Sequence, residues 1–298
     1  MKTKAFAWLS STVVLASILA GCGVNPVSND LTTMATSHLR LFTDGLGHAR
    51  RFGYRLGYHQ TVNFPSFSYN NFSANLPAAV DLRQTGKISP VYDQGDLGAC
   101  TAFAMGKGLR ETLTNLAGAP AESYSALYLY YKERELENTV DQDSGAYLHD
   151  GMNVLKNDGE CLDATMPYDT SKFTQKPSAQ AEQEAANFKI DTFTALPNLQ
   201  AMKEALAAGH PCVFGFTVYQ SFMTQQVAET GMMPMPQPGE QVEGGHAVMI
   251  VGYNDAKQVL IIKNSWGTNW GDNGYFYMPY AYVTPNNVDE IYTATAHD

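Results

Sequence analysis

The chain has 298 residues, of which 44% are hydrophobic and 16% charged, so it is long enough and apolar enough to bury a core in one or two domains. Its formal net charge is −10 and it has no cluster of Lys and Arg, which excludes an electrostatic surface for nucleic acid. No repeat with a period of about 20 to 50 residues is visible, which excludes a solenoid or a propeller.

The N-terminus carries the pattern of a secretory leader. Two lysines precede an apolar stretch over residues 5–20, which is short for a membrane span. The stretch ends in LAGC, residues 19–22, which resembles the lipobox of bacterial lipoproteins, where the leader is cut before an acylated cysteine. We therefore expect residues 1–21 to be a signal peptide, and Cys22 to carry fatty acyl chains such as palmitate that anchor the protein to a lipid bilayer. Secretion with an unmodified Cys22 is the alternative.

Residues 22–75 separate this leader from the rest of the chain. The residue after the cysteine is Gly23 and not Asp, as in lipoproteins that are sorted to the outer membrane. We therefore expect the protein to lie in the bacterial cell envelope. The second half of the stretch is rich in aromatic residues, which favour burial. These are Phe52, Tyr54, Tyr58, Phe64, Phe67, Tyr69 and Phe72. We expect residues 23 to about 45 to be a tether and residues from about 46 to 75 to pack on the following domain. The hypothesis is that this second part lies across the cleft of the domain as a short inhibitory propeptide.

The four cysteines limit the kinds of site that the protein can contain. If Cys22 carries lipid, three cysteines remain. Outside the cytoplasm, where cysteines pair in disulfides, an odd number predicts one free, catalytic thiol. No Cys-x-x-Cys pair or zinc-ligand spacing occurs, so we expect no metal and no cofactor. Cys161 lies in a predicted loop and Cys212 in an apolar stretch typical of a buried strand. The two are either joined in one disulfide or buried separately as free thiols.

Cys100 stands where a glycine-containing turn meets a helical pattern. The apolar residues that recur at three- and four-residue spacing after it are Ala102, Met105, Leu109, Leu113 and Leu116. They predict a core-facing helix that begins at the cysteine. Gly95 and Gly98 permit a tight turn with positive φ before it. Free N–H groups at a helix start lower the pKa of a thiol, so the sequence predicts a nucleophile, with a buried hydrophobic cysteine as the alternative.

A base for this nucleophile is available at His246. It follows two glycines and begins a predicted strand over residues 247–253, and Asn264 stands at the end of the next strand, residues 260–263. Trp266 follows two residues later, as expected for aromatic packing near this site.

These stretches together resemble the papain-like cysteine peptidases, in a bacterial branch. The resemblance is carried by LPAAVDLRQTGKISPVYDQGDLGAC, which ends at Cys100, by the order Gln94, Cys100, His246, Asn264, and by the blocks GHA, GYND and KNSWGTNWGDNGY. It covers about residues 76–298 and implies an α+β fold with a helical subdomain, a β-rich subdomain and a cleft between them. Helical patterns fill much of residues 100–187 and 199–209, and strands are predicted at 212–218, 247–253, 258–263 and 274–278.

The resemblance also implies roles for individual residues. Cys100 would attack a peptide carbonyl as a thiolate paired with protonated His246, Asn264 would orient the imidazole, and Trp266 would shield their hydrogen bond. The side chain of Gln94 and the N–H of Cys100 would hold the oxyanion. Substrate contacts are implied for Gly145, Gly215, Ala247 and Trp266, and Ala294 is a further candidate. Gly145 would bond the substrate main chain. The small apolar residues Gly215, Ala247 and Ala294 would line the pocket for the side chain that precedes the scissile residue, which predicts a bulky hydrophobic guest there.

Three departures accompany the resemblance. Thr101 stands where relatives have Trp, Leu97 stands in place of a disulfide-forming Cys, and Gly245 replaces Asp or Asn. We expect a monomeric peptidase that acts on peptides or proteins. The alternatives are a cell-wall endopeptidase of the NlpC type and a catalytically inactive lipoprotein that uses the fold to bind peptides.

Overall fold

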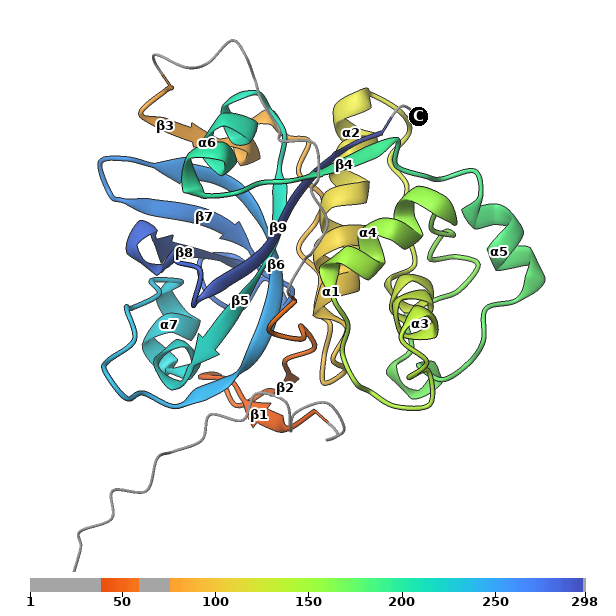
Figure 1. The fold of residues 1–298 in the computed structure, drawn as a ribbon, viewed down its shortest axis with the longest axis horizontal. Coiled ribbons are helices and arrows are strands. Elements are labelled where there is room, and N and C mark those ends of the chain that lie inside the picture. Colours follow the sequence, from red (N-terminus) through yellow and green to blue (C-terminus); the bar gives the residue numbers. More distant parts are fainter. Residues whose placement is uncertain (1–38, 59–75, 297–298) are drawn as a thin grey trace, which may run out of the picture. The chain divides into compact units, whose positions relative to one another are not determined.

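The computed structural model describes residues 39–58 and 76–296 of the chain. In the ribbon, the strands of one sheet gather on one side and helices α1 to α5 on the other (Figure 1). The predicted signal peptide, Cys22 and residues 59–75 lie outside the described residues. Within the described residues, no helix combines the length and the apolar character needed to cross a bilayer.

The sheet has seven antiparallel strands. Its order is β4 (Thr192–Ala195), β9 (Val288–Thr295), β5 (Cys212–Tyr219), β6 (Val242–Asn254), β7 (Val259–Lys263) and β8 (Tyr275–Pro279), and β3 (Ala79–Asp81) pairs with β6. β5, β6 and β7 are almost entirely buried, as their continuous apolar sequences require.

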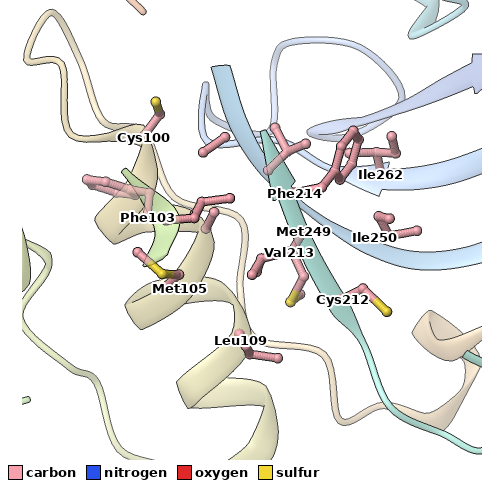
Figure 2. Close-up of a cluster of buried hydrophobic side chains, with 14 of the residues drawn as sticks. Cys100, Phe103, Met105, Leu109, Cys212, Val213, Phe214, Met249, Ile250 and Ile262 are labelled. Atoms are coloured by element: carbon pink, nitrogen blue, oxygen red, sulfur yellow. The ribbon is translucent and has the colours of Figure 1, made fainter. Parts of the chain in front are cut away.

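One continuous helix packs against this sheet and carries Cys100 at its start. It comprises α1 (Cys100–Ala102), a wider π-helical stretch (Phe103–Arg110) and α2 (Glu111–Ala117). Its apolar side chains face those of β5 and β6 (Figure 2). Gly108 faces β6, where a Cβ would lie in ordinary van der Waals contact with Met249. The predicted start of this helix at Cys100 is confirmed.

The remaining helices surround these elements. They are α3 (Ala126–Leu136), α4 (Leu148–Asn157), α5 (Ala179–Ala185), α6 (Leu199–Ala207) and α7 (Gln225–Thr230). The predicted α+β class is confirmed, and the four predicted strands agree with β5 to β8, although β6 begins five residues earlier than expected. The strands β3, β4 and β9 were not predicted.

The N-terminal residues 39–58 lie on the domain instead of extending away from it. Strands β1 (Leu41–Thr43) and β2 (Ala49–Arg51) form a hairpin, drawn in orange between the sheet and the helices in Figure 1. After β2 the chain continues beside residue 146, where Tyr54 forms a parallel bridge with Ala146. The three cysteines in the described part of the chain, Cys100, Cys161 and Cys212, are all unpaired and buried.

Candidate active site

Cys100 occupies the first position of its helix, so its N–H has no acceptor within the helix. The turn before it needs glycine for two different reasons. Gly95 has φ 64°, in the left-handed region, as predicted. Gly98 does not have a positive φ; a Cβ there would instead collide with side chains of Leu39 and Asp143.

His246 is held by Asn264 at the meeting point of β6 and β7. The Oδ1 atom of Asn264 lies 2.8 Å from His246 Nε2 and also accepts the N–H of Ser265 at 2.8 Å. Because the Ser265 amide is a donor, this contact fixes Oδ1 as an acceptor, and Nε2 must carry the imidazole proton. Nδ1 is therefore unprotonated in neutral His246, and it is buried without a hydrogen-bond partner.

The two reactive groups are neighbours across the cleft. The thiol of Cys100 interacts with the main chain of Ala247, the residue next to His246 on β6. Trp266 lies over the imidazole with ring centroids 5.1 Å apart, where it shields the bond between His246 and Asn264 from water.

Gln94 is fixed beside the nucleophile. Its Oε1 accepts the Ser265 hydroxyl at 2.6 Å, which turns the Nε2 donor toward the main chain before Cys100. Nε2 donates to Leu97 O at 2.9 Å and approaches Arg51 O at 3.4 Å. Nε2 carries two hydrogens, so departure of Arg51 with the rest of the segment would leave one of them, next to the free N–H of Cys100, for a developing oxyanion.

Asp143 connects the loop before Cys100 to α3 and to the loop of residues 143–146, on the helical side of the cleft. Its carboxylate accepts the Gly98 N–H at 3.1 Å and the Tyr130 hydroxyl at 2.5 Å. A carboxylate with several donors forms strong hydrogen bonds. In relatives, a disulfide holds the loop at the position of Leu97. Here the hydrogen bond between Gly98 and Asp143 joins this loop to residues 143–146 without a covalent link.

The N-terminal segment, residues 50–58, covers these groups. The main chain is bonded on both sides: Tyr54 N–H donates to Gly245 O at 3.0 Å, Ala146 N–H donates to Gly53 O at 2.8 Å, and Arg55 N–H donates to Ala146 O at 3.1 Å. The Phe52 ring lies 5.8 Å from the His246 ring. Cys100 and His246 are consequently 0% exposed.

Glycines on both sides make room for the segment. A Cβ on Gly53 would collide with the carbonyl of Gly98, and a Cβ on Gly245 would collide with Tyr54 O. Gly145, at φ 68°, faces Gly53 O with equally little space. The main chain of the segment therefore contacts the domain at a distance that only glycine permits.

Burial changes the protonation of the reactive pair. Desolvation raises the pKa of Cys100 to about 12, against the lowering effect of the main-chain donors of Ala247 and Gly53. Desolvation also lowers the pKa of His246 to about 4, and the nearby Arg50 guanidinium acts in the same direction. In the covered cleft the pair is a neutral thiol and a neutral imidazole, whereas the helix start had predicted a thiolate. The covering segment is the physical reason for the difference.

The expected substrate contacts are placed as follows. On the helical side of the cleft, the main-chain groups that bond the segment belong to Ala146 and not to Gly145. The Gly145 N–H donates instead to the Tyr130 hydroxyl at 3.0 Å. Gly215 lies under the ring of Tyr54, and Ala247 pairs with Gly215 in the register of β5 and β6. Ala294 lies on β9, where it pairs with Phe193.

Three residues that contribute to the site were not found from the sequence. Ser265 could have been, since it stands within the NSW motif. Asp143 and Ala146 had no sequence signal, because only the folded chain brings them to the cleft. Among the described residues, no group of three or more His, Cys, Asp and Glu side chains is placed to hold a metal ion.

Comparison with known proteins agrees with this geometry. The family model described as papain family cysteine protease matches residues 76–293. The chain belongs to the papain family of cysteine proteases. The match includes all four residues Gln94, Cys100, His246 and Asn264.

Individual members of the papain family resemble the chain over most of this domain. An uncharacterized peptidase C1-like protein of Acanthamoeba polyphaga mimivirus is 42% identical over 206 residues, which are 66% of this chain and 66% of that protein. Cathepsin S of Mus musculus is 31% identical over 225 residues, 74% of this chain and 62% of that protein. The chain thus spans two thirds or less of the length of these curated relatives.

A solved structure covers still more of the chain. Xylellain, a cysteine protease from Xylella fastidiosa, superposes with a TM-score of 0.76 at 32% identity, covering 88% of this chain and 99% of that one.

Proposed function

We propose that the chain is a cysteine peptidase that hydrolyses peptide bonds through Cys100, His246 and Asn264. The observation that carries the proposal is the fixed tautomer of His246, which leaves Nδ1 unprotonated, together with the contact between the Cys100 thiol and the main chain of the next residue, Ala247. The membership in the papain family supports the same chemistry.

The reaction follows from the positions of these groups. His246 Nδ1 takes the proton of the Cys100 thiol, and the thiolate sulfur attacks the peptide carbonyl carbon. Gln94 Nε2 and the Cys100 N–H stabilise the oxyanion, and one such donor contributes roughly 3 kcal/mol in the transition state. The C–N bond breaks as the imidazolium returns the proton to the leaving amine. A water molecule, deprotonated by His246, then hydrolyses the thioester and regenerates the thiol.

We further propose that residues 50–58 keep the full chain in a covered, inactive state. The segment presents the N–H of Gly53 to the Cys100 sulfur, where a substrate must present a carbonyl carbon, and the Gly53 carbonyl is bonded to Ala146 instead. Ion pairs add to the main-chain bonds: Arg51 with Asp143 at 3.2 Å, and Arg55 with Glu137. Cleavage requires this segment to leave the cleft.

The test of the activity is hydrolysis of a fluorogenic peptide amide by the Gly53→Ala chain, in which a Cβ against the Gly98 carbonyl should displace the covering segment, and by the same chain with Cys100→Ser. We expect the chain with Cys100→Ser to fold, as judged by circular dichroism, and to lose hydrolysis and labelling by an epoxide probe. Equal, measurable hydrolysis by the two proteins would disprove the assignment of the nucleophile. A Gly53→Ala chain that binds peptides, cleaves none and is not labelled would be a binding protein.

We also propose that the mature protein is a bacterial lipoprotein of the cell envelope. The support is the LAGC sequence at residues 19–22 and the glycine that follows it. Expression of the full chain in a bacterium should place it in the membrane fraction with the mass of an acylated Cys22, whereas Cys22→Ser should release it. A wild-type protein recovered without lipid would indicate ordinary secretion.

A further inference from the structure

The hydroxyl group of Tyr130 is buried on the helical side of the cleft. It donates to Asp143 Oδ1 at 2.5 Å and accepts the N–H of Gly145 at 3.0 Å. Tyr130 lies on α3 and is 0% exposed, so water does not compete for either bond. Burial raises the pKa of Tyr130 well above its ordinary value, and the neighbouring Asp143 adds to this rise, so the hydroxyl keeps its proton. One oxygen atom thus connects both ends of residues 143–145.

The side chain of Tyr130 is held in place by Arg134, one turn further along α3. The guanidinium carbon of Arg134 lies 4.0 Å from the centroid of the Tyr130 ring, and its Nε donates to Tyr130 O at 3.0 Å. Its Nη1 atom donates to Val140 O at 3.0 Å and to Gln142 O at 2.8 Å. The same guanidinium group therefore fixes the tyrosine ring and the loop that leads to Asp143.

The two partners of the hydroxyl belong to different parts of the active site. Asp143 accepts the N–H of Gly98, two residues before the nucleophile. Gly145 precedes Ala146, whose N–H and C=O bond the covering segment. Gly145 has φ 68°, and glycine loses more conformational freedom than any other residue when its backbone is fixed. The direction of the Ala146 groups therefore depends on a bond that holds Gly145, and the Tyr130 hydroxyl provides it.

We propose that Tyr130 is a positioning residue for substrate binding, because its hydroxyl places the Ala146 main chain where the main chain of a substrate bonds. The inference rests on the proposed peptidase function and extends it to a residue that touches neither the substrate nor the reacting atoms. The covering segment shows the geometry, since Ala146 forms one hydrogen bond with Gly53 at 2.8 Å and one with Arg55 at 3.1 Å. A substrate that replaces the segment meets the same two groups.

Tyr130→Phe removes this one oxygen atom and keeps the ring beside Arg134. The Gly145 N–H then loses its acceptor, and the Asp143 carboxylate loses a donor. Because a buried donor without a partner is costly, the main chain at residues 145–146 shifts and its bonds to a substrate weaken. These bonds are present in the ground state and in the transition state alike. The loss should therefore appear in KM, with kcat within about twofold of its original value.

The experiment compares Tyr130→Phe with Tyr131→Phe, both in the Gly53→Ala chain, in which the covering segment should be displaced. Tyr131 is the next residue of α3, and its hydroxyl forms no hydrogen bond with the described residues. Two rates are measured: kcat/KM for a blocked phenylalanyl-arginine amide of a fluorogenic amine, and alkylation of Cys100 by iodoacetamide. Their ratio cancels the share of protein with an open cleft, since both reactions require it. We expect Tyr130→Phe to lower the ratio about tenfold and Tyr131→Phe to leave it unchanged.

A second measurement needs no turnover. In the chain with no other substitution the segment itself bonds Ala146, so Tyr130→Phe should speed alkylation of Cys100 several-fold relative to Tyr131→Phe. Circular dichroism and thermal unfolding establish that the variants are folded at the assay temperature. If Tyr130→Phe does not fold, Asp143→Asn takes its place. It keeps an acceptor oxygen but removes the charge that strengthens the bond to the hydroxyl, so it should lower the ratio of hydrolysis to alkylation in the same direction.

The outcomes separate the two proposals. An unchanged ratio of hydrolysis to alkylation in Tyr130→Phe, a fall in kcat at constant KM, or an unchanged alkylation rate in the chain with no other substitution would overturn the inference and leave the peptidase assignment intact. A Gly53→Ala chain that is alkylated at Cys100 but cleaves no amide would overturn the proposed function and this inference with it.

Discussion

Gly53 lies against the carbonyl of Gly98 with no space for a side chain between them. The contact places the segment directly over the start of the nucleophile's helix. Replacing either glycine must push the two chains apart, so this pair controls how well the cleft is covered.

Gly53→Ala should therefore uncover Cys100 in the full chain. Overpacking of this kind costs about 1–3 kcal/mol, which corresponds to a roughly 5- to 150-fold rise in the alkylation rate of Cys100. Ala49→Ser is the control, because it adds one atom at an exposed position of the neighbouring strand β2. An alkylation rate for Gly53→Ala equal to that of Ala49→Ser would show that the segment does not limit access.

Asn264→Ala should impair catalysis and spare binding. Without the Oδ1 acceptor, the imidazole of His246 loses its fixed tautomer and orientation, and general acid–base catalysis depends on both. We expect kcat to fall about ten- to a thousandfold with KM little changed. Steady-state kinetics measure this split, and the exposed Asn187→Ala is the control. A rise in KM at constant kcat would mean that Asn264 serves substrate binding instead.

Acid should release the covering segment through His246. In the covered cleft its pKa is lowered to about 4, chiefly by burial, whereas the ordinary value is 6.5. The uncovered state therefore binds a proton that the covered state does not. The covered state has its full stability above pH 6.5 and loses up to about 1.4 kcal/mol per pH unit as the pH falls from 6.5 toward 4.

Hydrogen exchange of the Ala146 amide, which donates to Gly53, reports this release. In full-chain Cys100→Ser, protection corrected for the intrinsic rate should decrease between pH 7 and pH 4. The same protein with His246→Gln should show a smaller decrease. Protection that is constant over this range would contradict the linkage.

Asp143→Ala should destabilise the domain. The substitution leaves the Gly98 N–H and the Tyr130 hydroxyl without their acceptor. Hydrogen bonds to a charged group contribute about 1.5–3 kcal/mol each, so we expect a loss of about 3 kcal/mol and a Tm lower by roughly 6–12 °C. Thermal unfolding measures the change. The exposed Asp141→Ala should stay within about 0.5 kcal/mol of wild type, and an equally small effect of Asp143→Ala would show that the tie is dispensable.

The positions of Cys100 and His246 could be predicted because local patterns determine them. The apolar stripe after Cys100 defines where its helix begins, and two glycines mark the start of the buried part of β6 at His246. The resemblance to a known family then supplied the partners of these two residues. The α+β class followed from the separation of helical and strand patterns along the chain.

The contact of β9 with α4 and the course of the covering segment could not be predicted in this way. Glu290 has a left-handed backbone, and nothing near it in the sequence indicates that its carboxyl group accepts the N–H groups of Leu148 and His149. Aromatic residues in the segment indicated burial without saying on which surface. Only the long-range pairing of Tyr54 with Ala146 and Gly245 defines the register.

Cys161 and Cys212 are buried as separate thiols, and the described fold contains no covalent cross-link. Apolar packing and hydrogen bonds such as those of Asp143 hold the loops together. A reducing agent therefore breaks no bond in this part of the chain. Millimolar dithiothreitol, added to keep a catalytic sulfur reduced during assays, leaves its architecture intact.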